Sequence, residues 1–202
     1  MRFLDDTTAL LERTPRVLDD LLGGLPEAWL DGRDTPDGWQ PRDVLGHLIS
    51  AEIDDWIPRV EIILEHGPNR PFDPFDRFAH VDRDRGVPLS ELLARFSQLR
   101  AANLRQLRDR VTDDDLDRIG AHPRLGEVTL RQLLATWAVH DLDHIAQVFA
   151  ALSASQGRGR GALEGLPRHP APPCRPQRRA GLAVARAKAR GHSRAAGPCP
   201  VR

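Results

Sequence analysis

The chain has 202 residues, of which 40% are hydrophobic and 5% aromatic, so it can bury an aliphatic core in one domain that carries a tail. Its formal net charge is zero, but residues 1–152 hold 28 acidic and 18 basic side chains, whereas residues 153–202 hold 11 basic side chains and one acid. An acidic body argues against a nucleic-acid or anionic membrane surface there. Both cysteines lie after residue 152, so nothing in the body requires an oxidising compartment.

The amino terminus shows no targeting segment. Its first six residues, Met-Arg-Phe-Leu-Asp-Asp, contain no apolar stretch of the kind found in signal peptides. No apolar run approaches the ~18 residues that a membrane span needs. We therefore expect a soluble cytoplasmic protein without a membrane partner.

The first two predicted helices lie near residues 5–22 and 41–65. Leucines and valines at helical spacing mark the first, and Thr14-Pro15, a capping residue followed by a first-turn proline, predicts a kink or restart within it. Gly23-Gly24 should end it. Pro41 suits the first turn of the second helix, and Pro58 should bend that helix.

The last two predicted helices lie near residues 90–111 and 129–150. A long connection over residues 67–88, rich in Pro, Phe and Asp, precedes them, and loops of that length often cover a site. Thr129 and Gln132 fit a capping box, in which each side chain satisfies a backbone N–H of the other residue. Four helices with one apolar stripe each, and no convincing strand, predict an all-α four-helix bundle.

The helical pattern ends after about residue 152. The remaining residues are mostly Arg, Gly, Pro and Ala, which offer few side chains for a packed core. We predict a bundle domain over residues 1–152 and a disordered tail over 153–202. The arginine-rich tail could touch phosphates nonspecifically, but it has no aromatic side chains for stacking and no recognition motif, so a nucleic-acid partner is disfavoured.

Three histidines are candidate metal ligands. His140 and His144 are four residues apart, so their imidazoles project from one helix face about one turn apart. They share that face with Trp137 and Val148, which should point into the core. His47 lies on the apolar face of the second predicted helix. Three neutral imidazoles from two helices could hold Zn²⁺, Ni²⁺ or Fe²⁺ and leave a position open for water or substrate. The alternative for each is a core histidine satisfied by a hydrogen bond.

The other polar candidates are less specific. Asp141 or Asp143 could orient an imidazole from behind, and the alternative for both is a solvated carboxylate. His66, His80 and His122 lie in predicted loops or at a helix end, where solvated or locally capping roles are expected.

The same residues resemble the DinB-like superfamily. The segments that carry the resemblance are Trp39-Gln-Pro-Arg-Asp-Val-Leu-Gly-His47-Leu48, Trp56-Ile-Pro-Arg59, Gly126-Glu-Val-Thr-Leu130 and His140-Asp-Leu-Asp-His-Ile-Ala-Gln147. The resemblance implies an up-down bundle, often dimeric, with a three-histidine metal site at His47, His140 and His144. Characterised relatives include bacillithiol S-transferases and mycothiol-dependent isomerases, in which the metal is thought to activate a low-molecular-weight thiol.

The chain departs from this family after Gln147. The family's closing segment, of the type Gly-Pro-Trp-basic-Ala-Tyr-Leu, is missing, but codons for residues 161–167 can encode such a segment when read one nucleotide later. We therefore hypothesise a frameshift between Gln147 and Gly161, which the nucleotide sequence would test.

Three functions remain open from the sequence. The first is a metal-dependent enzyme of the thiol S-transferase type, or one that activates water, acting on a small-molecule substrate. The second is a non-catalytic metal or small-molecule binder used in a stress response, and the third is nucleic-acid association through the tail. Because residues 1–152 contain no cysteine, any thiol in the first function must come from a cofactor.

Overall fold

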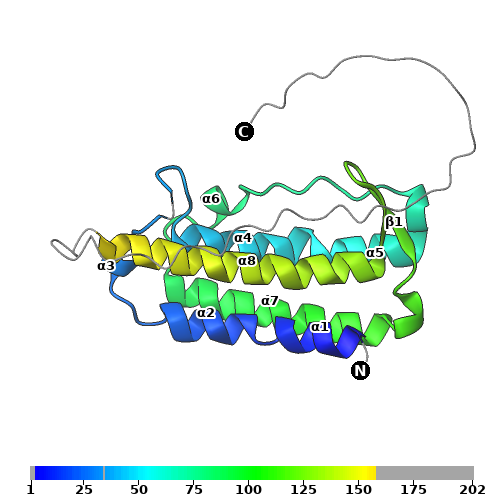
Figure 1. Cartoon of the computed structure of the whole chain (residues 1–202), viewed down its shortest axis with the longest axis horizontal. Helices are drawn as coiled ribbons and strands as arrows, with labels where there is room; N and C mark the ends of the chain where they lie inside the picture. The colour runs from blue at the N-terminus through cyan, green and yellow to red at the C-terminus, as the bar shows by residue number, and fades with distance from the viewer. Residues whose placement is uncertain (1–2, 34, 158–202) are drawn as a thin grey trace, which may run out of the picture. The chain divides into compact units, whose positions relative to one another are not determined.

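Four helical rods, two of them broken, form a bundle in the computed structural model, which describes residues 3–33 and 35–157 (Figure 1). The all-α bundle predicted from the sequence is confirmed. The predictions for the tail beyond residue 157 lie outside the described residues. No helix of the described residues is long and apolar enough to cross a membrane.

The first rod is broken where the sequence predicted a restart. It consists of α1 (Phe3–Leu11) and α2 (Thr14–Leu22). Pro15 lies in the first turn of α2 and has no N–H to donate to the carbonyl of Leu11, four residues earlier. That carbonyl instead accepts a hydrogen bond from Arg100 (2.8 Å). The break therefore supplies a backbone acceptor to the bundle interior.

The second rod is interrupted rather than simply bent. α4 (Pro41–Asp54) and α5 (Trp56–His66) are separated by a single residue, Asp55. Pro58 cannot donate to the carbonyl of Asp54, and its ring crowds that carbonyl, so the break falls one turn before the proline. The distortion predicted from Pro58 is confirmed, and it takes the form of a break one turn before the proline.

α7 (Leu89–Arg110) and α8 (Leu130–Gly157) are the uninterrupted rods. The predicted capping box at the start of α8 is confirmed: Thr129 N–H donates to Gln132 Oε1 (2.9 Å), and Gln132 N–H donates to Thr129 Oγ1 (3.2 Å). At its other end α8 runs to Gly157, a few residues beyond the point near residue 152 where the helical pattern was expected to end.

The connections between the rods contain short helices and single turns. Short helices occupy Glu27–Leu30 (α3) and His80–Arg83 (α6), and single 3₁₀ turns occupy Gly67–Asn69 (η1) and Asp113–Asp115 (η2). α6 packs on α4 at Gly46, where an added Cβ would lie 2.9 Å from the Cβ of His80 and 2.9 Å from Oδ2 of Asp84. Only a residue without a side chain permits this approach.

The expectation that no strands form was wrong. β1 (Ile119–His122) and β2 (Gly126–Thr129) make a short antiparallel hairpin, with Gly126 at φ +77°. Gly120 lets the hairpin rest on Ile63 and Phe72, because a Cβ there would lie within 3 Å of both side chains. The hairpin therefore owes its place to tertiary contact, and four-residue strands are too short to show clear alternation in the sequence.

The buried hydrophobic residues form two clusters with polar side chains between them. Along α7, one cluster includes Leu92 and Phe96, and the other resumes at Leu104 and Leu107. Arg100 and Asn103, both buried, lie between the two sets. On α8, the residues between Trp137 of one cluster and Val148 of the other include the polar side chains of His140, Asp141 and His144. A polar layer thus crosses the bundle between its apolar halves.

Candidate metal centre

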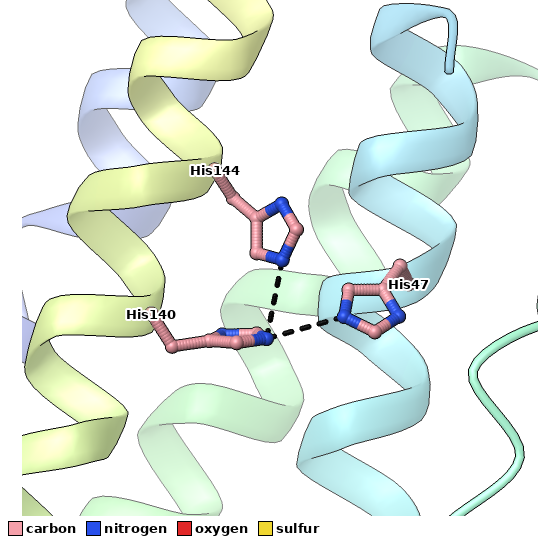
Figure 2. A group of neighbouring side chains, drawn as sticks. All are labelled: His47, His140 and His144. Carbon is pink, nitrogen blue, oxygen red and sulfur yellow. Dashed lines mark hydrogen bonds between the residues drawn. The ribbon is translucent and has the colours of Figure 1, made fainter. Parts of the chain in front are cut away.

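The three predicted histidines meet in this polar layer. His47 projects from α4, and His140 and His144 project from α8 toward it (Figure 2). Nε2 of His140 lies 3.1 Å from Nε2 of His47 and 3.2 Å from Nε2 of His144. One ligand nitrogen from each residue lies within 4.8 Å of the other two. The fold therefore brings together side chains that are 93 residues apart in the sequence.

Hydrogen bonds behind two of the rings determine which nitrogen faces the group. Nδ1 of His47 lies 3.4 Å from the carbonyl oxygen of Arg77, and a carbonyl can only accept. Nδ1 must therefore carry the proton, which leaves Nε2 with a free lone pair. Nδ1 of His144 lies 2.9 Å from Oε1 of Gln147 and donates in the same way. Nδ1 of His140 has no hydrogen-bond partner among the described residues.

Burial keeps the three imidazoles neutral. It lowers the pKa of His47 to about 4, with a further contribution from the charge of His144, and lowers the pKa of His140 to about 3 with contributions from both other histidines. Burial also lowers the pKa of His144. All three lone pairs are consequently available near neutral pH, which is the protonation state a metal ligand needs.

This donor set fits a divalent cation. Metal–nitrogen bonds of about 2.0–2.1 Å at tetrahedral angles separate the nitrogens by roughly 3.3 Å. The two separations that involve Nε2 of His140, 3.1 and 3.2 Å, match that requirement, and the three ligand nitrogens all lie within 4.8 Å of one another. Two of the three rings already have the tautomer that presents Nε2 inward. Three protein ligands leave a coordination position for a small molecule, as in catalytic rather than structural zinc sites.

Aromatic rings surround the imidazoles. The ring of Trp39 lies 4.9 Å from that of His47 and stacks on that of His144 at 6.2 Å and 16°. Phe75 approaches His47 at 5.6 Å, and Trp56 approaches His140 at 5.2 Å. Apolar walls of this kind exclude water and strengthen electrostatic interactions at the histidines.

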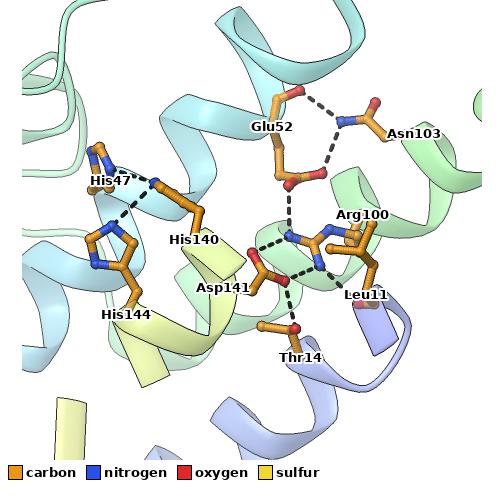
Figure 3. A network of polar contacts seen from close by, with 9 residues as sticks. All are labelled: Leu11, Thr14, His47, Glu52, Arg100, Asn103, His140, Asp141 and His144. Carbon is orange, nitrogen blue, oxygen red and sulfur yellow. Dashed lines mark hydrogen bonds and ion pairs between the residues drawn. The ribbon is translucent and has the colours of Figure 1, made fainter. Parts of the chain in front are cut away.

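Asp141 does not hydrogen-bond an imidazole. Its oxygens accept from Thr14 Oγ1 (2.6 Å) and from Arg100 Nη1 and Nη2 (2.6 and 3.0 Å), as Figure 3 shows. The reason is helical geometry, because neighbouring residues point about 100° apart and Asp141 therefore faces α7 while His140 faces α4. The proposed role of orienting an imidazole is taken by Gln147 and the Arg77 carbonyl. Asp143 is exposed, which agrees with the alternative considered from the sequence, a solvated carboxylate.

Arg100 is the centre of a buried polar network beside the histidines. It is 1% exposed and donates to Glu52 (2.8 Å) as well as to Asp141, while Asn103 donates to the carboxylate and the backbone carbonyl of Glu52. Burial disfavours its charged form, but the two carboxylates outweigh this and raise the pKa of Arg100. Burial raises the pKa of Glu52 despite Arg100. Two carboxylates share one guanidinium, and the network links α2, α4, α7 and α8.

Three other histidines lie among the described residues, and the structure agrees with the expectation for two of them. His66 is exposed, and Nδ1 of His122 caps its own turn by accepting from the N–H groups of Arg124 and Leu125. His80 was expected to be solvated or capping, but it is buried at 2% exposure in α6, with its ring 5.2 Å from Trp39. Gly46 permits this burial, which no local pattern at residue 80 indicates.

The fold and the three-histidine group define a helical-bundle protein with a candidate mononuclear metal centre. The family model of the DinB superfamily matches residues 10–148, and the chain belongs to that superfamily. The resemblance stated from the sequence is thereby confirmed, and its segments fall on α4, α5, β2 and α8.

Individual relatives agree with this membership. A protein of Oceanobacillus iheyensis, named as a metal-dependent hydrolase, is 26% identical over 139 residues, which cover 68% of this chain and 79% of the relative. The structure of YfiT from Bacillus subtilis, described as a metal-dependent hydrolase with an unusual four-helix bundle topology, matches with a TM-score of 0.65 at 25% identity and covers 78% of this chain and 87% of YfiT. Both descriptions give the hydrolase activity as an assignment still to be proved.

A second structure supports the fold alone. TT2238, described as a four-helix bundle protein, matches with a TM-score of 0.51 at 22% identity, covering 73% of this chain and 98% of TT2238.

Proposed function

We propose that the protein binds one divalent metal ion, Zn²⁺, Ni²⁺ or Fe²⁺, through Nε2 of His47, His140 and His144, and that it is a metal-dependent enzyme acting on a small molecule. The observation that supports this most directly is the convergence of three neutral imidazoles on one point between α4 and α8. The metal-dependent activity named for the two relatives is consistent with it.

A cation bound there would lower the pKa of a thiol or a water molecule at its open position toward neutrality and so supply a nucleophile. The protein residues contribute positioning and exclusion of water. Gln147 and the Arg77 carbonyl hold the protons of two imidazoles on Nδ1, and the Trp39 and Phe75 rings cover His47.

The residues around the histidines favour a thiol over water as the nucleophile. The group of ligand atoms contains no carboxylate, and the buried carboxylates of Glu52 and Asp141 are bound to Arg100. Attack by water usually gains from a general base, whereas a thiolate needs none. We therefore propose transfer of a low-molecular-weight thiol, such as bacillithiol, to an electrophile, with the thiol arriving as a cosubstrate.

Metal content tests the site. Protein purified without an affinity tag should contain about one equivalent of a divalent metal by elemental analysis. His47→Ala, His140→Ala or His144→Ala should abolish stoichiometric binding while helical circular dichroism persists. His66→Ala, which removes an exposed histidine, is the matched control and should bind like the wild type. A triple variant that kept stoichiometric metal would refute the site.

Turnover tests the chemistry. The metal-loaded protein is mixed with monochlorobimane and, in turn, with bacillithiol, mycothiol, glutathione or cysteine, and fluorescent conjugate is measured. We expect acceleration with at least one thiol and none in the His140→Ala variant. If the protein binds metal but accelerates neither conjugate formation with any of the thiols nor the hydrolysis of an ester, it is the non-catalytic binding protein instead. The homodimer that the family implies is a separate prediction, which light scattering would test.

A further inference from the structure

Arg77 lies beside the three histidines, and no carboxylate among residues 3–33 and 35–157 pairs with it. Its backbone carbonyl is bonded to His47, so the residue is fixed next to that ligand. Its side chain is exposed, and none of the ion pairs of the described residues involves it. This is notable on a body with 28 acids and 18 bases over residues 1–152.

Two aromatic rings hold the guanidinium in place. Its Cζ atom lies 5.1 Å from the ring centre of Trp39 and 5.2 Å from that of Phe78. An arginine over an aromatic face is restrained without losing its hydrogen-bond donors at the edge of the guanidinium. Trp39 is the same ring that stacks on His144 and contacts His47. One aromatic side chain thus lies next to both the ligand histidines and the free cation.

Arg77 places a positive charge next to the candidate ligands, since its Cζ atom and the ring of His47 lie 5.1 and 4.9 Å from the same Trp39 ring. A positive group beside a candidate cation site is unfavourable unless an anion lies near both. Phe78, which is 54% exposed, gives the same surface an apolar patch.

We propose that Arg77 is a specificity-determining residue for the metal centre, and that the small molecule bound over the histidines carries an anionic group (carboxylate, sulfonate or phosphate) which pairs with its guanidinium. The planar fork of an arginine suits such oxyanions. This inference rests on the proposed metal site and names the chemical class that the site accepts.

The experiment uses the full chain loaded with Co²⁺, whose absorbance reports thiolate binding. Three two-carbon thiols carry terminal groups of different charge: 2-mercaptoethanesulfonate is anionic, 2-mercaptoethanol is neutral and cysteamine is cationic. Sulfonate is a weak metal ligand, so any preference for it reflects the protein. We expect the wild type to bind the sulfonate about three- to tenfold more tightly than the alcohol, and cysteamine more weakly than either.

Variants assign the preference to a residue. Arg77→Gln should bring the sulfonate-to-alcohol ratio close to one without weakening Co²⁺ binding, since the change removes a repulsive charge and keeps the backbone carbonyl bonded to His47, and Arg77→Lys should keep part of the preference. Arg105→Gln, which removes an exposed arginine of α7, is the control and should match the wild type. A preference that persists in Arg77→Gln, or its absence from the wild type, overturns this inference but leaves the metal site standing. Failure of the wild type to bind Co²⁺ overturns the proposed function and the inference together.

Discussion

Arg100→Met tests whether the buried network stabilises the bundle. The change removes the only cation in contact with Glu52 and Asp141 among the described residues, together with the donor to the Leu11 carbonyl. The side chains of both acids are 0% exposed, so water cannot replace the lost partner. Breaking a buried ion pair by removing one member typically destabilises by about 3–5 kcal/mol, a large share of the ~5–15 kcal/mol of a typical domain.

The assay is urea unfolding of metal-free protein at pH 7, followed by circular dichroism. Arg110→Met is the control, because Arg110 also lies on α7 and pairs with two glutamates, Glu61 and Glu65, but at the surface. We expect the control to leave the unfolding midpoint nearly unchanged. Adding Glu52→Gln to Arg100→Met should recover part of the lost stability, since one buried carboxylate is then neutral. A loss below about 1 kcal/mol for Arg100→Met would refute the reasoning, because it would mean that the carboxylates need no cation.

Three further predictions concern single positions. Burial raises the pKa of Asp55 to about 6 from an ordinary value of 3.8, so between these pH values the folded protein binds more protons than the unfolded chain, and stability falls as pH rises. Asp55→Asn should not show this loss of stability, because asparagine does not ionise. The difference in unfolding free energy between the variant and the wild type, measured with urea, should therefore change by up to about 3 kcal/mol in favour of the variant from pH 4 to pH 6, and parallel pH profiles would contradict this. Gly46→Ala should destabilise by about 1–3 kcal/mol because its Cβ would press on His80, and an unchanged midpoint would show that α6 moves away freely. Thr129→Ala should lower stability by about 1 kcal/mol by removing the cap of α8, whereas Thr129→Ser should not.

The bundle and the three histidines were predictable because their signals are local. Each long helix shows its own apolar stripe, and two of the three candidate ligands lie one turn apart on one helix. The prediction for the third, His47, depended only on the apolar face of its helix being the buried one. The break before Thr14 was predictable because proline cannot donate a backbone hydrogen bond. The capping box of α8 was predictable because hydroxyl and amide side chains can satisfy the free N–H groups at the start of a helix.

What the sequence did not reveal depends on partners distant along the chain. An arginine on an amphipathic helix is normally assigned to its solvated face, and Arg100 is buried only because Glu52 and Asp141 come from two other helices. The burial of His80 depends on the absence of a side chain at Gly46, on another helix. The assignment of Asp141 to an imidazole failed for the same reason, because its partner is on α7. The ligand roles of the histidines stay a prediction.

The spacing of the three histidines also bears on how a bound cation would stabilise the folded chain. His140 and His144 are neighbours on one helix, whereas His47 is 93 residues from His140. A cation held by all three would need these distant segments to be brought together by the fold, so it would bind the folded chain far better than the unfolded one. At a free concentration of about 1,000 times its dissociation constant it would add about 4 kcal/mol to the stability of the fold. Metal would therefore fasten α4 to α8, two helices whose ligands are separated by 93 residues of chain.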